Sequence, residues 1–196
     1  MPAKRPAPRL EIYSEDQLND EQRALVEAIR SSPRGRSSGR AGPFAVWMHA
    51  PAFGDLAQQM GAHCRYRTVL QPRLAEFAIL CTARMWRAQY EWFAHAPLAE
   101  KAGVKPQTIA DLRAGRPLKR AAKDERAIYE FVKELYKTRR VKDRTYARVR
   151  AFLDDRAMVE LVGILGYYTL ISMALNIFRM LPQAEAKLPF SEPGWR

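Results

Sequence analysis

Apolar residues recur at helical rather than strand spacing along most of the chain. The segment 20–30 (DEQRALVEAIR) is amphipathic, follows the N-cap residue type Asn19, and has acidic residues in its first turn. No stretch alternates apolar and polar residues for long, and no Asn-Gly or Asp-Gly hairpin turn occurs. The pattern predicts an all-α protein of about seven or eight helices, without an internal repeat.

Proline and glycine mark several helix ends in this pattern. Pro72 suits the first turn of a helix, because its missing N–H would be unpaired there in any case. Gly103 and Gly115 are typical left-handed residues after a helix. The helices expected between these signals span about 51–66, 72–81, 88–102, 106–115 and 157–178, and a further amphipathic helix lies within 119–150.

The chain divides into one domain with two flanking segments. Residues 31–43 (SSPRGRSSGRAGP) are rich in Ser, Gly and Arg, which predicts a flexible loop. The segment from Pro182 is Pro-rich, which predicts irregular structure. We therefore expect an N-terminal helix and loop over 1–41, a helical domain over 42–181 and an irregular tail over 182–196; 196 residues suffice for one domain.

The apolar stretch 157–178 is long enough to cross a membrane, but it contains Glu160 and Asn176. A carboxylate is unfavourable in lipid, so a buried central helix of a soluble protein is the better interpretation. Residues 1–9 lack the apolar core of a secretory signal. We expect a cytoplasmic protein with no membrane partner.

The formal net charge of +12 first suggests a nucleic-acid partner. Residues 119–150 contain 12 Lys and Arg against five Asp and Glu, a local excess of seven positive charges. In the same stretch Ile128, Phe131, Val132 and Leu135 recur at helical spacing, so the charges belong to the outer face of an amphipathic helix. No helix-turn-helix, RNP or zinc motif accompanies them, and nucleic acid is therefore not the expected partner.

Candidate chemistry centres on Glu91 and His95, which share one helix face four residues apart. A carboxylate at this distance orients an imidazole and raises its basicity, which suits proton transfer near neutral pH. Glu76 lies on the preceding predicted helix, beside an apolar face. Surface placement of these residues is the alternative. The two cysteines, Cys64 and Cys81, are too few and too far apart for a disulfide framework, a zinc site or a Cys-x-x-Cys redox pair.

Residues 76 to 103 resemble the core motif of the carboxymuconolactone decarboxylase and alkylhydroperoxidase-like superfamily. The shared pattern is a Pro-Arg-x-x-Glu helix opening, an apolar helix, Glu-x-x-x-His and a terminating glycine. Further context is similar over roughly 42–180, in Gly42-Pro43-Phe44, His49-x-Pro51, Glu160-Leu161-Val162, Gly166-Tyr167-Tyr168 and Asn176. The resemblance implies a multihelical fold and a homo-oligomer.

Peroxidase members of this superfamily carry Cys-x-x-Cys where this chain has Ala88 and Glu91. Thiol peroxidase chemistry needs a low-pKa thiolate beside a resolving thiol, so the dithiol mechanism is not expected. The resemblance to the decarboxylase branch implies a carboxy-lyase with no cofactor and no metal. Its substrate would be a small carboxylated lactone or a related acid of aromatic-compound catabolism.

By the same resemblance, His95 is the expected proton donor or relay, with Glu91 orienting it and Glu76 as the second carboxylate. Weaker candidates for substrate contact are His49, Tyr90 and Trp92, and Arg84 or Arg87 could hold a substrate carboxylate. The core interpretation of both aromatic residues stays open.

Three alternatives remain at this point. One is a peroxidase-related antioxidant protein (peroxiredoxin-type activity) that uses a non-standard thiol such as Cys81. Another is a nucleic-acid-binding helical protein that uses the basic residues of 119–150. The last is a helical scaffold without catalytic activity.

Overall fold

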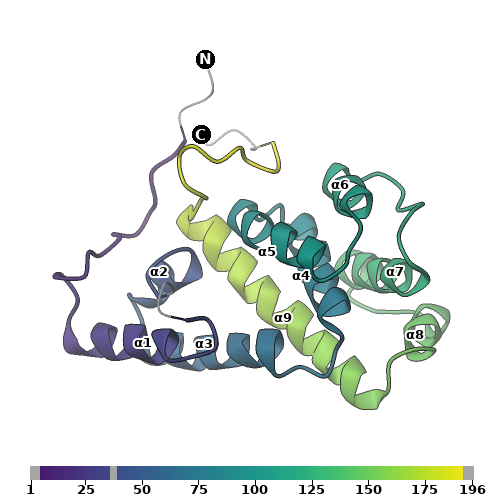
Figure 1. Ribbon diagram of the computed structural model, residues 1–196, viewed down its shortest axis with the longest axis horizontal. Helices are drawn as coiled ribbons and strands as arrows, with labels where there is room; N and C mark the ends of the chain where they lie inside the picture. The colour runs from purple at the N-terminus through teal and green to yellow at the C-terminus, as the bar shows by residue number, and fades with distance from the viewer. Residues whose placement is uncertain (1–4, 36–38, 192–196) are drawn as a thin grey trace.

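The computed structural model describes residues 5–35 and 39–191, and this part of the chain is all-α, without a strand (Figure 1). The all-α prediction is confirmed. The nine helices of the described residues are α1 (Asp20–Arg30), α2 (Pro43–Trp47), α3 (Pro51–Tyr66), α4 (Pro72–Trp86), α5 (Gln89–Lys101), α6 (Pro106–Ala114), α7 (Lys123–Thr138), α8 (Asp143–Arg150) and α9 (Asp155–Phe178).

The N-terminal helix α1 begins as the sequence predicts. The Gln22 N–H donates to the Asn19 side chain at 2.9 Å, and the Gln22 side chain accepts from the Asn19 N–H at 2.9 Å, which completes a capping box. The buried side of α1 carries Leu25, Val26 and Ile29 and packs against α3. A cap of this kind stabilises a helix by about 1 kcal/mol.

Helix α9 runs through the middle of the fold and packs against α2, α3, α4, α5 and α8 (Figure 1). Its length and composition would also suit a membrane span. In this fold Leu161, Ile164, Tyr168 and Leu175 are almost fully buried against the neighbouring helices. Burial of each such side chain contributes about 1.5–3 kcal/mol, so α9 is the principal core helix.

The start of α7 is fixed to the start of α4 by one arginine. Arg73 pairs with Asp124 at 2.6 Å and with Glu125 at 2.7 Å. Glu125 also accepts the Ala122 N–H at 2.8 Å and so caps α7. These contacts hold the first turn of α4, and Glu76 follows one turn later.

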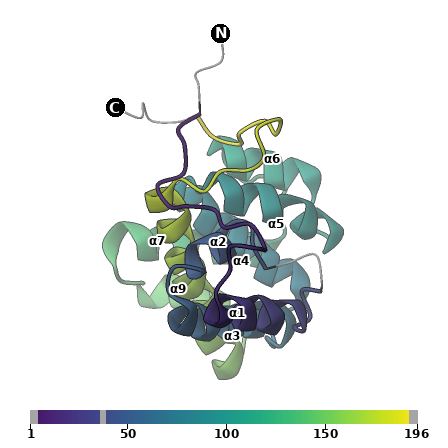
Figure 2. The same ribbon diagram turned by 90° about the vertical axis from the view of Figure 1, so that its left-hand side faces the viewer.

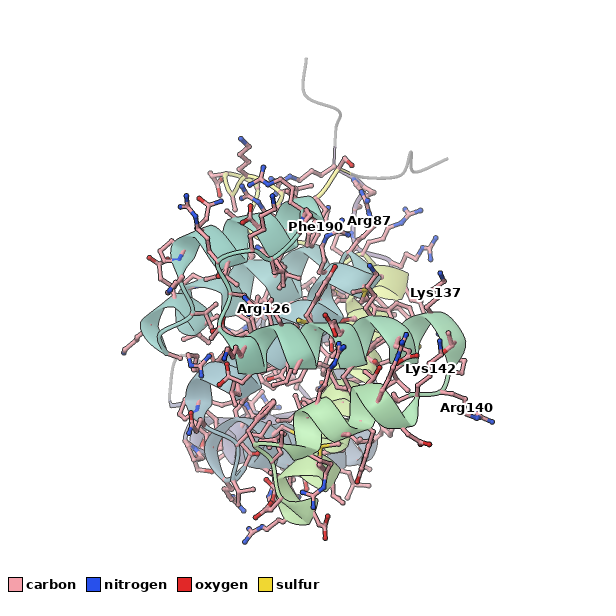
Figure 3. The ribbon with its side chains drawn as sticks, turned by 90° about the vertical axis from the view of Figure 1, so that its right-hand side faces the viewer. Arg87, Arg126, Lys137, Arg140, Lys142 and Phe190 are labelled. Atoms are coloured by element: carbon pink, nitrogen blue, oxygen red, sulfur yellow. The ribbon has the colours of Figure 1, made fainter. Side chains whose placement is uncertain are left out.

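The basic stretch 119–150 forms two main helices rather than one. Arg139 takes a left-handed conformation (φ 60°) and ends α7, and α8 begins four residues later. Lys137, Arg140 and Lys142 lie on the outer surface at this turn (Figure 3), whereas Ile128 and Val132 are fully buried. The predicted outward position of the charges is correct.

The described parts of both chain ends lie together (Figure 2). Arg9 donates to the carbonyls of Phe178 and Ile177 at 3.0 and 2.9 Å, and Arg5 donates to the carbonyl of Ala186. No helix occurs in 182–191, although Phe190 is buried there. Parts of the predicted N-terminal segment, loop and tail, residues 1–4, 36–38 and 192–196, lie outside the described residues, and the domain limits stay a prediction.

Candidate active site

The turn between α4 and α5 brings the three acid–base residues together. Only Arg87 and Ala88 separate the two helices, and Arg87 adopts φ 50°, so α5 packs back onto α4. His95 Nδ1 lies 2.6 Å from Glu76 Oε2, and His95 Nε2 lies 3.0 Å from Glu91 Oε1. One imidazole thus joins two carboxylates, and we call Glu76, His95 and Glu91 the relay.

The relay is withdrawn from solvent, with 5% of His95 and 3% of Glu91 exposed. Burial alone would lower the pKa of His95, but its hydrogen bonds to Glu76 and Glu91 outweigh burial and raise the pKa to about 9. At neutral pH the ring is therefore an imidazolium that donates one N–H to each carboxylate. The Tyr168 ring packs edge-on against His95, with centroids 5.1 Å apart.

A cavity of about 160 Å³ lies beside the relay. Glu91 and His95 line it, whereas Glu76 does not and lies behind the imidazole. Four of the nine other lining residues are aromatic: Phe44, Tyr90, Tyr167 and Tyr168. A buried proton relay that opens on an aromatic cavity is suited to exchanging protons with a small planar molecule.

Two glycines allow the aromatic wall to close. A methyl group on Gly61 would overlap the Tyr167 hydroxyl, and one on Gly42 would overlap the Tyr90 ring. Gly42 also has φ +59°, a conformation that favours glycine. The shape of the cavity therefore depends on the absence of side chains at these two positions.

Among the weaker sequence candidates, the structure places only Tyr90 at the cavity. His49 lies elsewhere: its Nε2 contacts the Glu11 carbonyl at 2.9 Å, and its ring stands 4.9 Å from that of Tyr13. Trp92 is buried against Phe190, with ring centroids 5.2 Å apart. Residues next to each other on a helix point in different directions, so Trp92 does not share the face of Glu91. The structure thus places His49 and Trp92 away from this cavity, and a substrate contact for either residue stays a prediction.

The arginines at the cavity are not those that the sequence suggested. Arg84 donates to the Leu112 carbonyl at 3.1 Å, and Arg87 donates to the Ser191 hydroxyl at 2.8 Å. Arg34, from the segment after α1, and Arg65, from the last turn of α3, line the cavity instead.

A signal for Arg65 is nevertheless present in the sequence. Gly54, Gln58 and Gly61 are three of the buried residues of α3 and follow one another at spacings of four and three, and Arg65 continues that stripe. A cation on the buried face of a helix requires a partner or a function. Arg34 offers no such signal, because it belongs to a segment without helical periodicity.

Neither thiol is placed for peroxide chemistry. Burial raises the pKa of the Cys64 thiol to about 11 and that of the fully buried Cys81 thiol well above its ordinary value. In the described ranges, no three His, Cys, Asp or Glu residues gather in a way that could hold a metal ion.

No family model matches the sequence, and no curated protein sequence matches it significantly. Solved structures do match. One is an uncharacterized peroxidase-related protein from Ralstonia eutropha JMP134, described as an alkylhydroperoxidase AhpD core. It matches with a TM-score of 0.74 at 17% sequence identity, and the match covers 93% of this chain and 95% of that chain. Another is an uncharacterized peroxidase-related protein from Silicibacter sp. TM1040, with a TM-score of 0.70 at 15% identity over 91% and 93%.

At these identities the likeness establishes the fold. This chain has the AhpD-like all-α fold, which confirms what its motif resemblance implied about architecture.

Proposed function

We propose that this protein is a cofactor-free acid–base enzyme that protonates a carbanion formed by decarboxylation of a small carboxylated ring compound. The observation that carries the proposal is the buried relay beside the aromatic cavity, with an imidazolium held between two carboxylates. Preorganised proton donors of this kind lower the barrier for protonation at carbon without a reorganisation of solvent.

The contacts of His95 change the roles that the sequence suggested. Both ring nitrogens are occupied, Nδ1 by Glu76 and Nε2 by Glu91. The ring therefore cannot donate directly to a ligand while both contacts persist. Glu91 is the member that lines the cavity and can turn an oxygen toward a ligand, so it is the terminal proton donor. His95 resupplies it, and Glu76 holds the ring in place.

The proposed reaction is a decarboxylation followed by protonation at carbon. The bond between the ring and its carboxylate breaks, CO₂ leaves, and the bonding electron pair delocalises over the unsaturated ring as an enolate-type anion. His95 passes its Nε2 proton to Glu91, and Glu91 protonates the ring carbon. A proton from solvent restores the imidazolium, so one proton is consumed for each CO₂ released.

The names of the solved relatives suggest a peroxidase as the competing function. Such an activity would need Cys64 or Cys81, because the relay contains no thiol. Replacement of both cysteines by alanine separates the two functions. Loss of hydroperoxide turnover in that variant would support the peroxidase, and unchanged turnover would exclude a thiol mechanism.

Proton transfer is tested directly in D₂O with a panel of carboxylated lactones and unsaturated ring acids. CO₂ release and deuterium at the new C–H bond are measured by NMR for the wild type, Glu91→Gln and His95→Gln. Both variants are expected to lose at least about 100-fold in rate, the usual contribution of a positioned acid or base. Glu100→Gln is the matched control, because Glu100 is exposed on the same helix and should leave the rate unchanged. Equal rates in all four proteins would contradict the proposal.

A homo-oligomer, inside the cytoplasm, remains part of the proposal. Exposed apolar side chains on α3 and α9 support self-association: Leu56 is 69% exposed and Val159 72% exposed. These two helices pack against each other, and exposed apolar side chains that gather on neighbouring helices favour a protein contact. Light scattering measures the oligomeric state of the wild type and of the double variant Leu56→Glu/Val159→Glu, which should dissociate. A wild type that is monomeric at high concentration would refute self-association.

A further inference from the structure

We propose that Arg65 is the residue that selects anionic ligands for this cavity, by pairing with a carboxylate on a single-ring molecule. The inference rests on the proposed function for the reaction at the other end of the ligand. Arg65 concerns ligand recognition and the relay concerns catalysis, so binding and turnover measurements distinguish the two proposals.

Arg65 lines the cavity, and no salt bridge joins it to an acidic residue in the part of the chain that the structure describes. Its Nε atom is buried and makes no hydrogen bond, and within 5–35 and 39–191 no carboxylate pairs with its terminal nitrogens. Its charge lies over the ring of Tyr66, with 5.0 Å from Cζ to the ring centroid. A buried donor left unpaired is unfavourable by itself, and an anion in the cavity would satisfy it.

Arg34 has a different position at the same cavity. It donates to the side-chain oxygen of Gln58 at 3.2 Å and to the Gln58 carbonyl at 2.9 Å, and its Cζ lies 5.4 Å from the centroid of the Phe44 ring. These contacts fasten the segment after α1 onto α3 and form one wall of the cavity. Arg34 adds positive charge there, while Arg65 keeps its donors for a ligand.

The size and lining of the cavity define the ligand class. An engineered closed cavity of about 150 Å³ holds one benzene molecule, so 160 Å³ accommodates one six-membered ring, and the open side of this cavity leaves space for its substituents. The flat faces of Phe44, Tyr90 and Tyr168 suit an unsaturated ring. An ion pair with Arg65 would oppose departure of the paired carboxylate as CO₂, so Arg65 holds a carboxylate that stays on the ring.

Benzoate and benzamide test this assignment, since they have nearly the same shape and differ in charge. Binding of each is measured by calorimetry to the wild type, Arg65→Met and Arg67→Met. Arg67 is the matched control, because it is exposed two residues away and does not line the cavity. Arg65→Met should bind benzoate about 10- to 100-fold more weakly and benzamide unchanged, the range expected for a charge-assisted hydrogen bond. Arg67→Met should match the wild type.

Arg65→Met should also unfold at an equal or higher temperature than the wild type, because a half-buried guanidinium with an unpaired buried Nε is removed. A purely structural arginine would give the opposite sign. If Arg65→Met does not fold, two comparisons remain: benzoate against benzamide in the wild type, and partial retention of benzoate binding by Arg65→Lys. Equal affinity of the wild type for both probes, or full benzoate binding by Arg65→Met, would overturn the inference.

Failure of the proposed function gives a different result. Glu91→Gln should keep or improve benzoate binding, because a nearby negative charge is removed, although it abolishes turnover. Arg65-dependent binding without turnover of any tested acid would contradict the decarboxylase and leave the anion site standing. Turnover that depends on Glu91 but not on Arg65 would contradict the anion site alone.

Discussion

The proton on the relay should make the stability of this protein fall between neutral and alkaline pH. His95 has a folded-state pKa of about 9, above the ordinary value of 6.5 that it regains on unfolding. Below pH 6.5 both states carry the proton. Between the two values only the folded state binds it, so raising the pH favours unfolding. The stabilisation is fully present below about pH 6.5 and is lost as the pH rises through about 9.

The magnitude follows from the same pKa values. A rise from 6.5 to about 9 corresponds to about 3 kcal/mol of stability, and the slope between these limits is about 1.4 kcal/mol per pH unit. Because native proteins are stable by only about 5–15 kcal/mol, this is a substantial part of the total. Loss of this stabilisation above pH 9 would leave the buried Glu91 and the partly buried Glu76 without a cation between them.

Urea unfolding of the wild type from pH 6 to 10 measures this slope, with Glu91→Gln/His95→Gln as the comparison. The double variant lacks both the imidazole and one carboxylate. The unfolding free energy of the wild type should therefore fall by about 3 kcal/mol relative to that of the double variant as the pH rises from 6 to 10. NMR titration of the three histidines gives the pKa of His95 directly. A His95 that titrates at or below pH 6.5, or parallel stability curves for the two proteins, would refute the reasoning.

Three further outcomes are expected. Gly61→Ala should lower the unfolding free energy by about 1–3 kcal/mol, measured by thermal melting, and displace Tyr167 from the cavity wall in a crystal structure. An unchanged melting temperature would contradict the close contact between Gly61 and Tyr167. Arg73→Met should destabilise the fold by about 2–3 kcal/mol in urea, because it leaves two carboxylates of α7 unpaired, while the exposed Arg113→Met should have no effect. The value of kcat/KM for decarboxylation should fall tenfold per pH unit above about pH 9, when His95 loses its proton; a rate that rises through this range would exclude the imidazolium as the proton source.

Local spacing explains why the relay was predictable. Glu91 and His95 are four residues apart on one helix, so their contact requires only that the helix form. Glu76 needed one further step, the packing of adjacent helices across a short turn. The prolines that begin α3, α4 and α6 were equally informative, because their preference for the first helical turn is intrinsic.

Helix ends and distant contacts were less predictable. Arg87, Arg139 and Arg179 take left-handed conformations after α4, α7 and α9, where glycine is the usual signal, so the sequence did not indicate the break between α7 and α8. Such a residue is disfavoured by about 1 kcal/mol, which the packing of the adjoining helices outweighs. Arg34 reaches the cavity only through tertiary packing, which no local pattern encodes, whereas Arg65 continues the helical spacing of Gly54, Gln58 and Gly61.

Tyr167 and Tyr168 are successive residues of the helix that five other helices contact. The cavity therefore cannot widen at this wall unless the centre of the protein moves with it, and close-packed interiors resist such movement. A ligand that fits would bind with little reorganisation of the protein, whereas one extra ring substituent would meet an unyielding surface. Affinity across a series of substituted ring acids should therefore drop abruptly with size rather than decline gradually.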